Sequence, residues 1–142
     1  MTRAPDWLQT VMLWTSPAFP VGAFSYSHGL EWMVESGQVT DRSSLEALAL
    51  ALLEFGDLQA DASFLCAAHQ SDMKTLPSVL EEAVSLRGAS ELAAESVNQG
   101  RAFIKALQSE GSDYPRLSAL QNTMSDVGIP HAVAFGAACA DA

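Results

Sequence analysis

Residues 16–31 read SPAFPVGAFSYSHGLE and concentrate unusual backbone chemistry in one short segment. Pro17 and Pro20 each fix φ and lack a backbone donor, whereas Gly22 and Gly29 can adopt conformations that other residues avoid. The segment also carries three aromatic rings, which would be unusual in a flexible linker. We therefore predict that these two prolines and two glycines shape one defined loop, around which the rest of the chain is arranged.

On both sides of this loop, apolar residues recur at the spacing of helices. No stretch has the alternating β-branched pattern of a strand, and there is no internal repeat. The helical patterns predict an all-α, single-domain bundle of about six to eight helices joined by short loops. The apolar residues that define them lie within residues 7–14, 30–34, 45–55, 58–69, 80–84, 93–107 and 117–127.

Several local signals predict where these helices begin, end or approach one another. Asp41, with Thr40, offers a cap for the helix with the clearest apolar stripe, and Ser43 with Glu46 offers an alternative capping box. Gly56 is expected to kink or end that helix. Gly100, within a long helix, is expected to let a neighbouring helix approach closely, although glycine costs about 1 kcal/mol of helix propensity relative to alanine.

Acidic residues outnumber basic ones: 17 Asp and Glu face 7 Lys and Arg, for a formal net charge of −10. Such a charge repels phosphate backbones and anionic lipids, so we expect neither nucleic acid nor a membrane as a partner. It suits a basic protein or a cation, although an acidic surface also serves solubility alone. Two distant cysteines, with no secretory signal and no membrane span, favour a reducing cytoplasm.

The last twelve residues, HAVAFGAACADA from His131 to Ala142, are almost all apolar or small. A helix that is apolar nearly all round belongs inside a larger core. Two interpretations follow: a partner chain covers this run, or the sequence is a fragment of a longer protein. We favour the fragment.

Metal binding is one chemistry that the sequence raises. Cys66 and His69 lie three residues apart, so on a helix they share a face and could hold one soft or borderline cation. Two ligands are too few for a structural zinc site, and cysteine is among the most commonly buried residues. Packing of both side chains in the core is therefore the favoured interpretation. His28 and His131 have no neighbouring ligand at a suitable spacing.

Catalysis has weaker support. Ser27 and His28 are adjacent, so their side chains would diverge rather than form a nucleophile–base pair. Around Ser25 the sequence AFSYS lacks the G-x-S-x-G elbow, and no phosphate-binding glycine motif occurs. We expect a protein that is not an enzyme, with no cofactor of its own. The aromatic residues of the loop then either dock a partner or fill the core, and the residues alone leave these two interpretations even.

The loop itself resembles the N-terminal signature of the urease accessory protein UreF family. Shorter matches to that family follow in the same order along the chain, and together they span most of it. They are Val39–Asp41, Ala94–Ser96, Gly100–Arg101, Gly128–His131 and Val133–Gly136.

This resemblance implies an all-α, non-enzymatic scaffold for nickel delivery to apo-urease in the cytoplasm. UreF proteins dimerise, bind UreD (called UreH in some species) and recruit the GTPase UreG, so GTP-dependent nickel insertion is the implied process. The homodimer is expected of the full-length form. The partner-binding residues are expected to be Phe24, Ser25, Tyr26, His28 and Glu31. The alternative is a metallochaperone that binds nickel directly through the Cys66–His69 pair described above.

Members of the family continue for several helices past the part that matches residues 133–136. The chain, residues 1–142, is therefore expected to be a UreF-like domain without the family's C-terminal helices. Within the loop, we expect Tyr26 and His28 to be exposed, and Phe19 and Leu30 to be buried.

Overall fold

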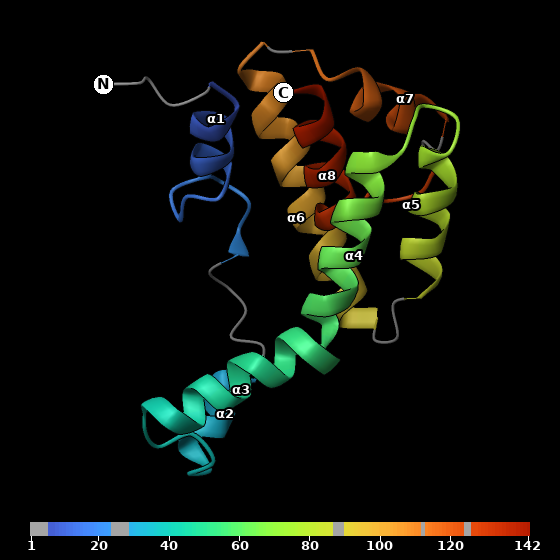
Figure 1. Ribbon diagram of the computed structural model, residues 1–142. Helices are drawn as coiled ribbons and strands as arrows, with labels where there is room; N and C mark the ends of the chain where they lie inside the picture. Colours follow the sequence, from blue (N-terminus) through green and yellow to red (C-terminus); the bar gives the residue numbers. More distant parts are fainter. Residues whose placement is uncertain (1–5, 24–28, 87–89, 112, 124–125) are drawn as a thin grey trace.

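The computed structural model describes residues 6–23, 29–86, 90–111, 113–123 and 126–142. Within these ranges the chain forms eight helices and no strand, which confirms the predicted all-α bundle (Figure 1). The helices are α1 (Asp6–Trp14), α2 (Leu30–Glu35), α3 (Arg42–Phe55), α4 (Asp57–Gln70), α5 (Leu76–Ser85), α6 (Ser90–Ser109), α7 (Pro115–Thr123) and α8 (His131–Asp141).

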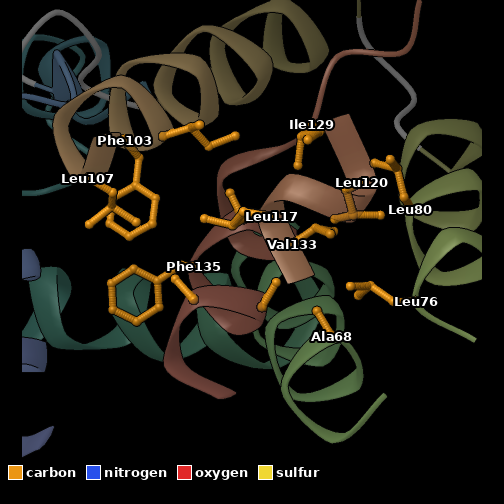
Figure 2. Packing of buried hydrophobic residues seen from close by; sticks show 14 of the residues in the cluster. Ala68, Leu76, Leu80, Phe103, Leu107, Leu117, Leu120, Ile129, Val133 and Phe135 are labelled. Carbon is orange, nitrogen blue, oxygen red and sulfur yellow. The ribbon is translucent and has the colours of Figure 1, made fainter. Parts of the chain in front are cut away.

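Helix α8 forms the centre of the bundle. Residues 132–138 are all buried, and the helix packs against α4, α6 and α7. Figure 2 shows side chains from these helices and from α5 converging on α8, with Phe103 and Phe135 facing each other at 5.4 Å between ring centroids. Other helices of this chain therefore cover the apolar terminal run, so the expectation that the run lacks cover within the chain is wrong.

Two glycines allow the close contacts around α8. A Cβ atom at Gly136 would overlap the backbone carbonyl oxygen of Leu65, so α4 and α8 lie backbone against backbone there. A Cβ atom at Gly100 would overlap the carbonyl oxygen of Ile129. The close approach predicted at Gly100 is thus confirmed, and the neighbour is the segment that leads into α8 rather than a helix.

Aromatic rings hold the end of α1 and the first part of the predicted loop to the bundle. Trp14 packs edge-on against Phe103 of α6 at 5.5 Å and against Phe135 of α8 at 5.9 Å between ring centroids. Phe19 packs against Phe103 at 5.6 Å and is 7% exposed, so its predicted burial is confirmed. Edge-to-face ring pairs of this kind add stabilisation beyond the apolar area that they bury.

Helices α2 and α3 extend away from the bundle, at the bottom of Figure 1. Asp41 is the N-cap of α3: its carboxylate accepts from the Ser44 backbone N–H at 2.8 Å, and the Ser44 hydroxyl accepts from the Asp41 N–H at 3.1 Å. The cap predicted at Asp41 is confirmed, and the alternative prediction of a capping box from Ser43 and Glu46 is wrong. Gly56 ends α3, as predicted, and it is also the N-cap of α4. No residue of α3 is buried.

Candidate functional site

An open groove of about 980 Å³ lies between α3 and the bundle. One wall is the leucine stripe of α3, formed by Leu45, Leu48 and Leu52. The facing wall comes from α4, α6 and α8, and much of it is also apolar, including Leu65 and Phe135. The α3 stripe therefore does not enter the core of this chain; it borders the groove.

Polar groups gather at one part of this groove. Glu95 of α6 is only 6% exposed, and its Oε1 accepts from the side-chain amide of Gln99 at 2.8 Å. Ser96 is also buried, and its hydroxyl accepts from the backbone N–H of His131 at 3.3 Å. Asp61 of α4 adds a second carboxylate to the lining. A buried carboxylate within an apolar groove is costly unless polar groups solvate it, so this cluster is a candidate recognition site.

The imidazole of His131 lies beside these groups. Its ring packs edge-on against Phe103, at 5.3 Å between ring centroids. Burial lowers its pKa below the usual 6.5, and the negative charge of Asp61 opposes that shift. At neutral pH the ring is therefore uncharged. Its Nε2 atom is buried and has no hydrogen-bond partner among the described residues.

The groove meets the C-terminal end of the predicted partner-binding segment. Gly29 and Leu30 both line it, and Glu31 is exposed one residue further on. Leu30 is 37% exposed, so its predicted burial is wrong, because it faces the open groove rather than the core.

The other predicted contact residues, Phe24, Ser25, Tyr26 and His28, lie outside the described residues, as does the predicted exposure of Tyr26 and His28. Their role in partner binding stays a prediction, as does that of Glu31.

The predicted loop-shaping residues also stay a prediction, although the backbone geometry at both glycines is unusual. Gly22 has φ 76° and Gly29 has φ 82°, a region that L-residues with side chains rarely adopt. Because φ is positive at Gly22 and Gly29, a side chain at either position would strain the backbone, whatever the space around it. Pro17 and Pro20 are both exposed.

The Cys66–His69 pair is not packed in the core. Both side chains are exposed on α4, so that interpretation is wrong: the buried side of α4 carries Ala68 together with the half-buried Phe64 and Leu65, which face the bundle. The described residues include no group of three or more His, Cys, Asp or Glu that could hold a metal ion. None of the described helices is long and apolar enough to cross a membrane.

Sequence reasoning missed the groove, although two signals were present. The α3 leucine stripe was the clearest periodic pattern in the chain, yet nothing in the sequence showed what covers it. Glu95 and Ser96 stood on the same side of a helix as large apolar residues, which is unusual for a carboxylate. Both signals indicate a groove only once the tertiary structure places α3 opposite α6.

Comparison with known proteins identifies similar chains. A sequence model of the UreF family matches residues 39–142. A urease accessory protein UreF from Azorhizobium caulinodans is 38% identical over 141 residues, which cover 96% of this chain and 61% of that protein. UreF proteins from Bradyrhizobium sp. strain ORS 278 and Rhodopseudomonas palustris strain BisB18 are 41% and 44% identical, over 74% and 69% of this chain and 45% and 42% of their own lengths.

The chain thus spans between about two fifths and three fifths of the length of these curated relatives. No solved structure matches it.

Proposed function

The chain belongs to the UreF family of urease accessory proteins, and we propose that it acts in urease maturation as a non-catalytic scaffold. In this role it binds UreD (UreH) and recruits the GTPase UreG, so that nickel is inserted into apo-urease. Nickel is then the cargo of the assembly rather than a cofactor of this chain. The process would take place in the cytoplasm, with the scaffold as a homodimer.

The observation that carries this proposal is the exposed apolar surface around α2 and α3. Trp32 is 62% exposed, and Leu45 on the groove wall is 45% exposed. Large exposed apolar areas on a soluble protein commonly mark the surfaces where other proteins dock. Large apolar and aromatic anchors are also the residues that dominate binding energy at interfaces. A scaffold that holds other proteins is therefore the function that this geometry supports best.

Co-purification tests the proposal. The tagged chain is co-expressed with UreD and UreG, and we expect both partners to be retained on the affinity resin. Washes at raised salt remove weak adsorption to the acidic surface, because the screening length of exposed charges falls from about 8 Å at physiological ionic strength to about 3 Å at 1 M. If helical circular dichroism shows a folded chain and neither partner is retained, the scaffold proposal is wrong.

The homodimer is tested separately. Light scattering coupled to size exclusion gives the mass of the purified chain in solution, and we expect twice the mass of one chain. A single-chain mass at high protein concentration would contradict the dimer without affecting the binding of UreD or UreG.

A further inference from the structure

We propose that the groove between α3 and the α4–α6–α8 bundle docks one helix of a partner protein, whose apolar face carries a lysine or arginine. The inference adds a binding mode to the proposed scaffold function. It rests on that function only for the identity of the protein that supplies the helix. The recognition chemistry belongs to this chain and can be measured with this chain alone.

The shape of the groove favours a helix. Its outer wall presents Leu45, Leu48 and Leu52 at positions i, i+3 and i+7, which form a ridge along one side of α3. Ridges of this spacing pack against the side-chain grooves of a neighbouring helix. The volume of about 980 Å³ corresponds to roughly eight residues, or two turns, of a helix about 10 Å in diameter.

The charge of the groove favours a cationic side chain on that helix. Among the described residues of its lining, Asp61 and Glu95 are acidic, and no lysine or arginine occurs. A cation that enters the groove is attracted by the negative charge of both carboxylates, and the attraction is stronger in a partly buried site than in water. A glutamate at the same position would be repelled, so the pair can discriminate between partners by charge.

His131 contributes a neutral group at the same place. Its buried Nε2 has no hydrogen-bond partner within the described part of the chain. In the tautomer that carries its proton on Nδ1, this atom accepts one hydrogen bond from the lysine or arginine that enters the groove. Because the ring is uncharged at neutral pH, it does not repel a cation. The site therefore combines negative charge, a hydrogen-bonding nitrogen and surrounding apolar walls.

The occupant is a partner rather than a second copy of this chain. The chain has a net charge of −10, so a second copy brings like charge to an acidic groove. A helix with a basic residue in an apolar face has the complementary charge and complementary shape. Docking of such a helix in a hydrophobic groove is a recurring mode of recognition between proteins.

The experiment uses a fluorescein-labelled synthetic helix of 14 residues, with leucines along one face and a central lysine on that face. Fluorescence anisotropy gives its Kd for the chain. A matched peptide with glutamate in place of the lysine should bind about tenfold more weakly, a difference of about 1.4 kcal/mol. Equal affinity of the two peptides would overturn the proposed recognition of charge.

Two pairs of variants locate the binding. Leu52→Arg places a charge in the groove, whereas Leu53→Arg places it on the next residue of α3, which is exposed and does not line the groove. Ala49→Glu and Ala47→Glu form a second pair, with only Ala49 in the groove. The groove variants should weaken binding of the lysine peptide about tenfold or more, and the controls less than about twofold. Circular dichroism verifies folding, and equal losses within both folded pairs would overturn the location.

Charge recognition is tested with neutral isosteres. Asp61→Asn and Glu95→Gln should each reduce the preference for the lysine peptide over the glutamate peptide, and Glu54→Gln, an exposed residue of α3 outside the groove, should leave it unchanged. An unchanged preference in both groove variants would contradict the role of these carboxylates.

Measurements of dimerisation and of partner retention distinguish a docked partner helix from a second copy of the chain. In one outcome, Leu52→Arg dissociates a dimer of the chain and the lysine peptide does not compete with dimer formation. This outcome would assign the groove to a second copy and overturn the inference. Retention of UreD and UreG by every groove variant would overturn UreD and UreG as the source of the docked helix, yet leave the scaffold function intact. Peptide binding without retention of either partner would leave the groove inference standing and contradict the scaffold function instead.

Discussion

Arg116 and Asp141, 25 residues apart in sequence, join the start of α7 to the end of α8. The guanidinium Nη1 of Arg116 donates to Asp141 Oδ1 at 2.5 Å, and the Arg116 backbone N–H donates to Asp141 Oδ2 at 2.9 Å. The same guanidinium donates to the carbonyl oxygens of Ala140 and of Ser71, the C-cap of α4. One arginine thus holds the ends of three helices together and satisfies carbonyl groups that a helix end leaves without a partner.

Replacing this arginine should destabilise the bundle. Arg116→Met keeps the apolar stem but removes the donors, which leaves the 8%-exposed side chain of Asp141 without its counter-charge. We expect a loss of about 1.5–3 kcal/mol in the free energy of unfolding, measured by urea denaturation. Arg101→Met is the control, because Arg101 is exposed and bonds Asn98 of its own helix, at 3.2 Å. Equal losses in the two variants would contradict the clamp.

The contact between α4 and α8 should not tolerate a methyl group at Gly136. In Gly136→Ala the new Cβ overlaps the backbone carbonyl of Leu65, which can move only if the helices separate. We expect a loss of about 1–3 kcal/mol in urea denaturation. Gly128→Ala is the matched control, because its new Cβ meets a side chain, that of Val97, rather than the backbone of a neighbouring helix. A smaller loss for Gly136→Ala than for Gly128→Ala would contradict this packing.

Burial of His131 should make the stability of the fold depend on pH. Its pKa is lowered in the folded state, so the unfolded chain takes up a proton near pH 6.5 that the folded chain resists. Stability therefore falls as the pH is lowered through 6.5, by up to about 1.4 kcal/mol between pH 7.5 and 5.5 for this one group. Asp61 of α4 reduces the effect, and Glu95 of α6 lies in the same groove.

Urea denaturation at several pH values measures this dependence. The free energy of unfolding of His131→Gln should depend less steeply on pH, because the variant lacks the imidazole. This expectation does not depend on how stable the variant is at pH 7.5. His69→Gln, an exposed residue of α4, is the control and should keep the wild-type slope. If wild type and His131→Gln have the same slope, the buried neutral imidazole is not the cause.

The capping box at Asp41 should set the start of α3. Asp41→Ala removes the acceptor for the Ser44 N–H, so the first turn should fray. Hydrogen exchange of the Ser44 and Leu45 amides should then become faster, because Leu45 N–H also bonds to Asp41, through its carbonyl oxygen. Asp41→Asn keeps a side-chain acceptor and should preserve most of the protection. Equal exchange in Asp41→Ala and wild type would show that the box contributes nothing.

The loop of residues 16–31 should matter more for partner capture than for folding. Tyr26→Ala and Gly22→Val should both reduce retention of UreD or UreG, with little change in helical circular dichroism. Gly111→Val is the matched control for Gly22→Val: both glycines have positive φ and open surroundings, at 76° and 74°, but Gly111 lies after α6. An equal loss of helicity and of capture would make the loop part of the core instead.

Much of the fold could be predicted from the sequence because helix signals are local. The apolar spacing, the cap at Asp41 and the break at Gly56 each depend on residues within a few positions. The choice between two neighbouring caps was harder, because Asp41 and the Ser43–Glu46 pair are both local signals for a helix start. Only the backbone geometry, in which the extended residue before the helix is Asp41, decides between them.

The candidate site could be predicted far less well. The motif contains two residues of the groove lining, Gly29 and Leu30, whereas nothing in the sequence combines Asp61, Glu95 and His131 into one site. These three residues come from α4, α6 and α8, and no sequence spacing relates them. The expected burial of the Cys66–His69 pair is wrong for a similar reason: the buried side of α4 depends on where α8 lies against it.

The sequence by itself determined that this chain is helical, where most of its helices begin and end, and which family it belongs to. These properties follow from periodicity and motifs that are read over short distances. Only the tertiary structure decided that the apolar run 131–142 forms the centre of the bundle, while the α3 leucines face an open groove. The physical reason is that an apolar stripe requires cover but does not specify which distant segment supplies it. Gly136 lets α4 pack closely on α8, whereas no segment among the described residues covers α3 in the same way.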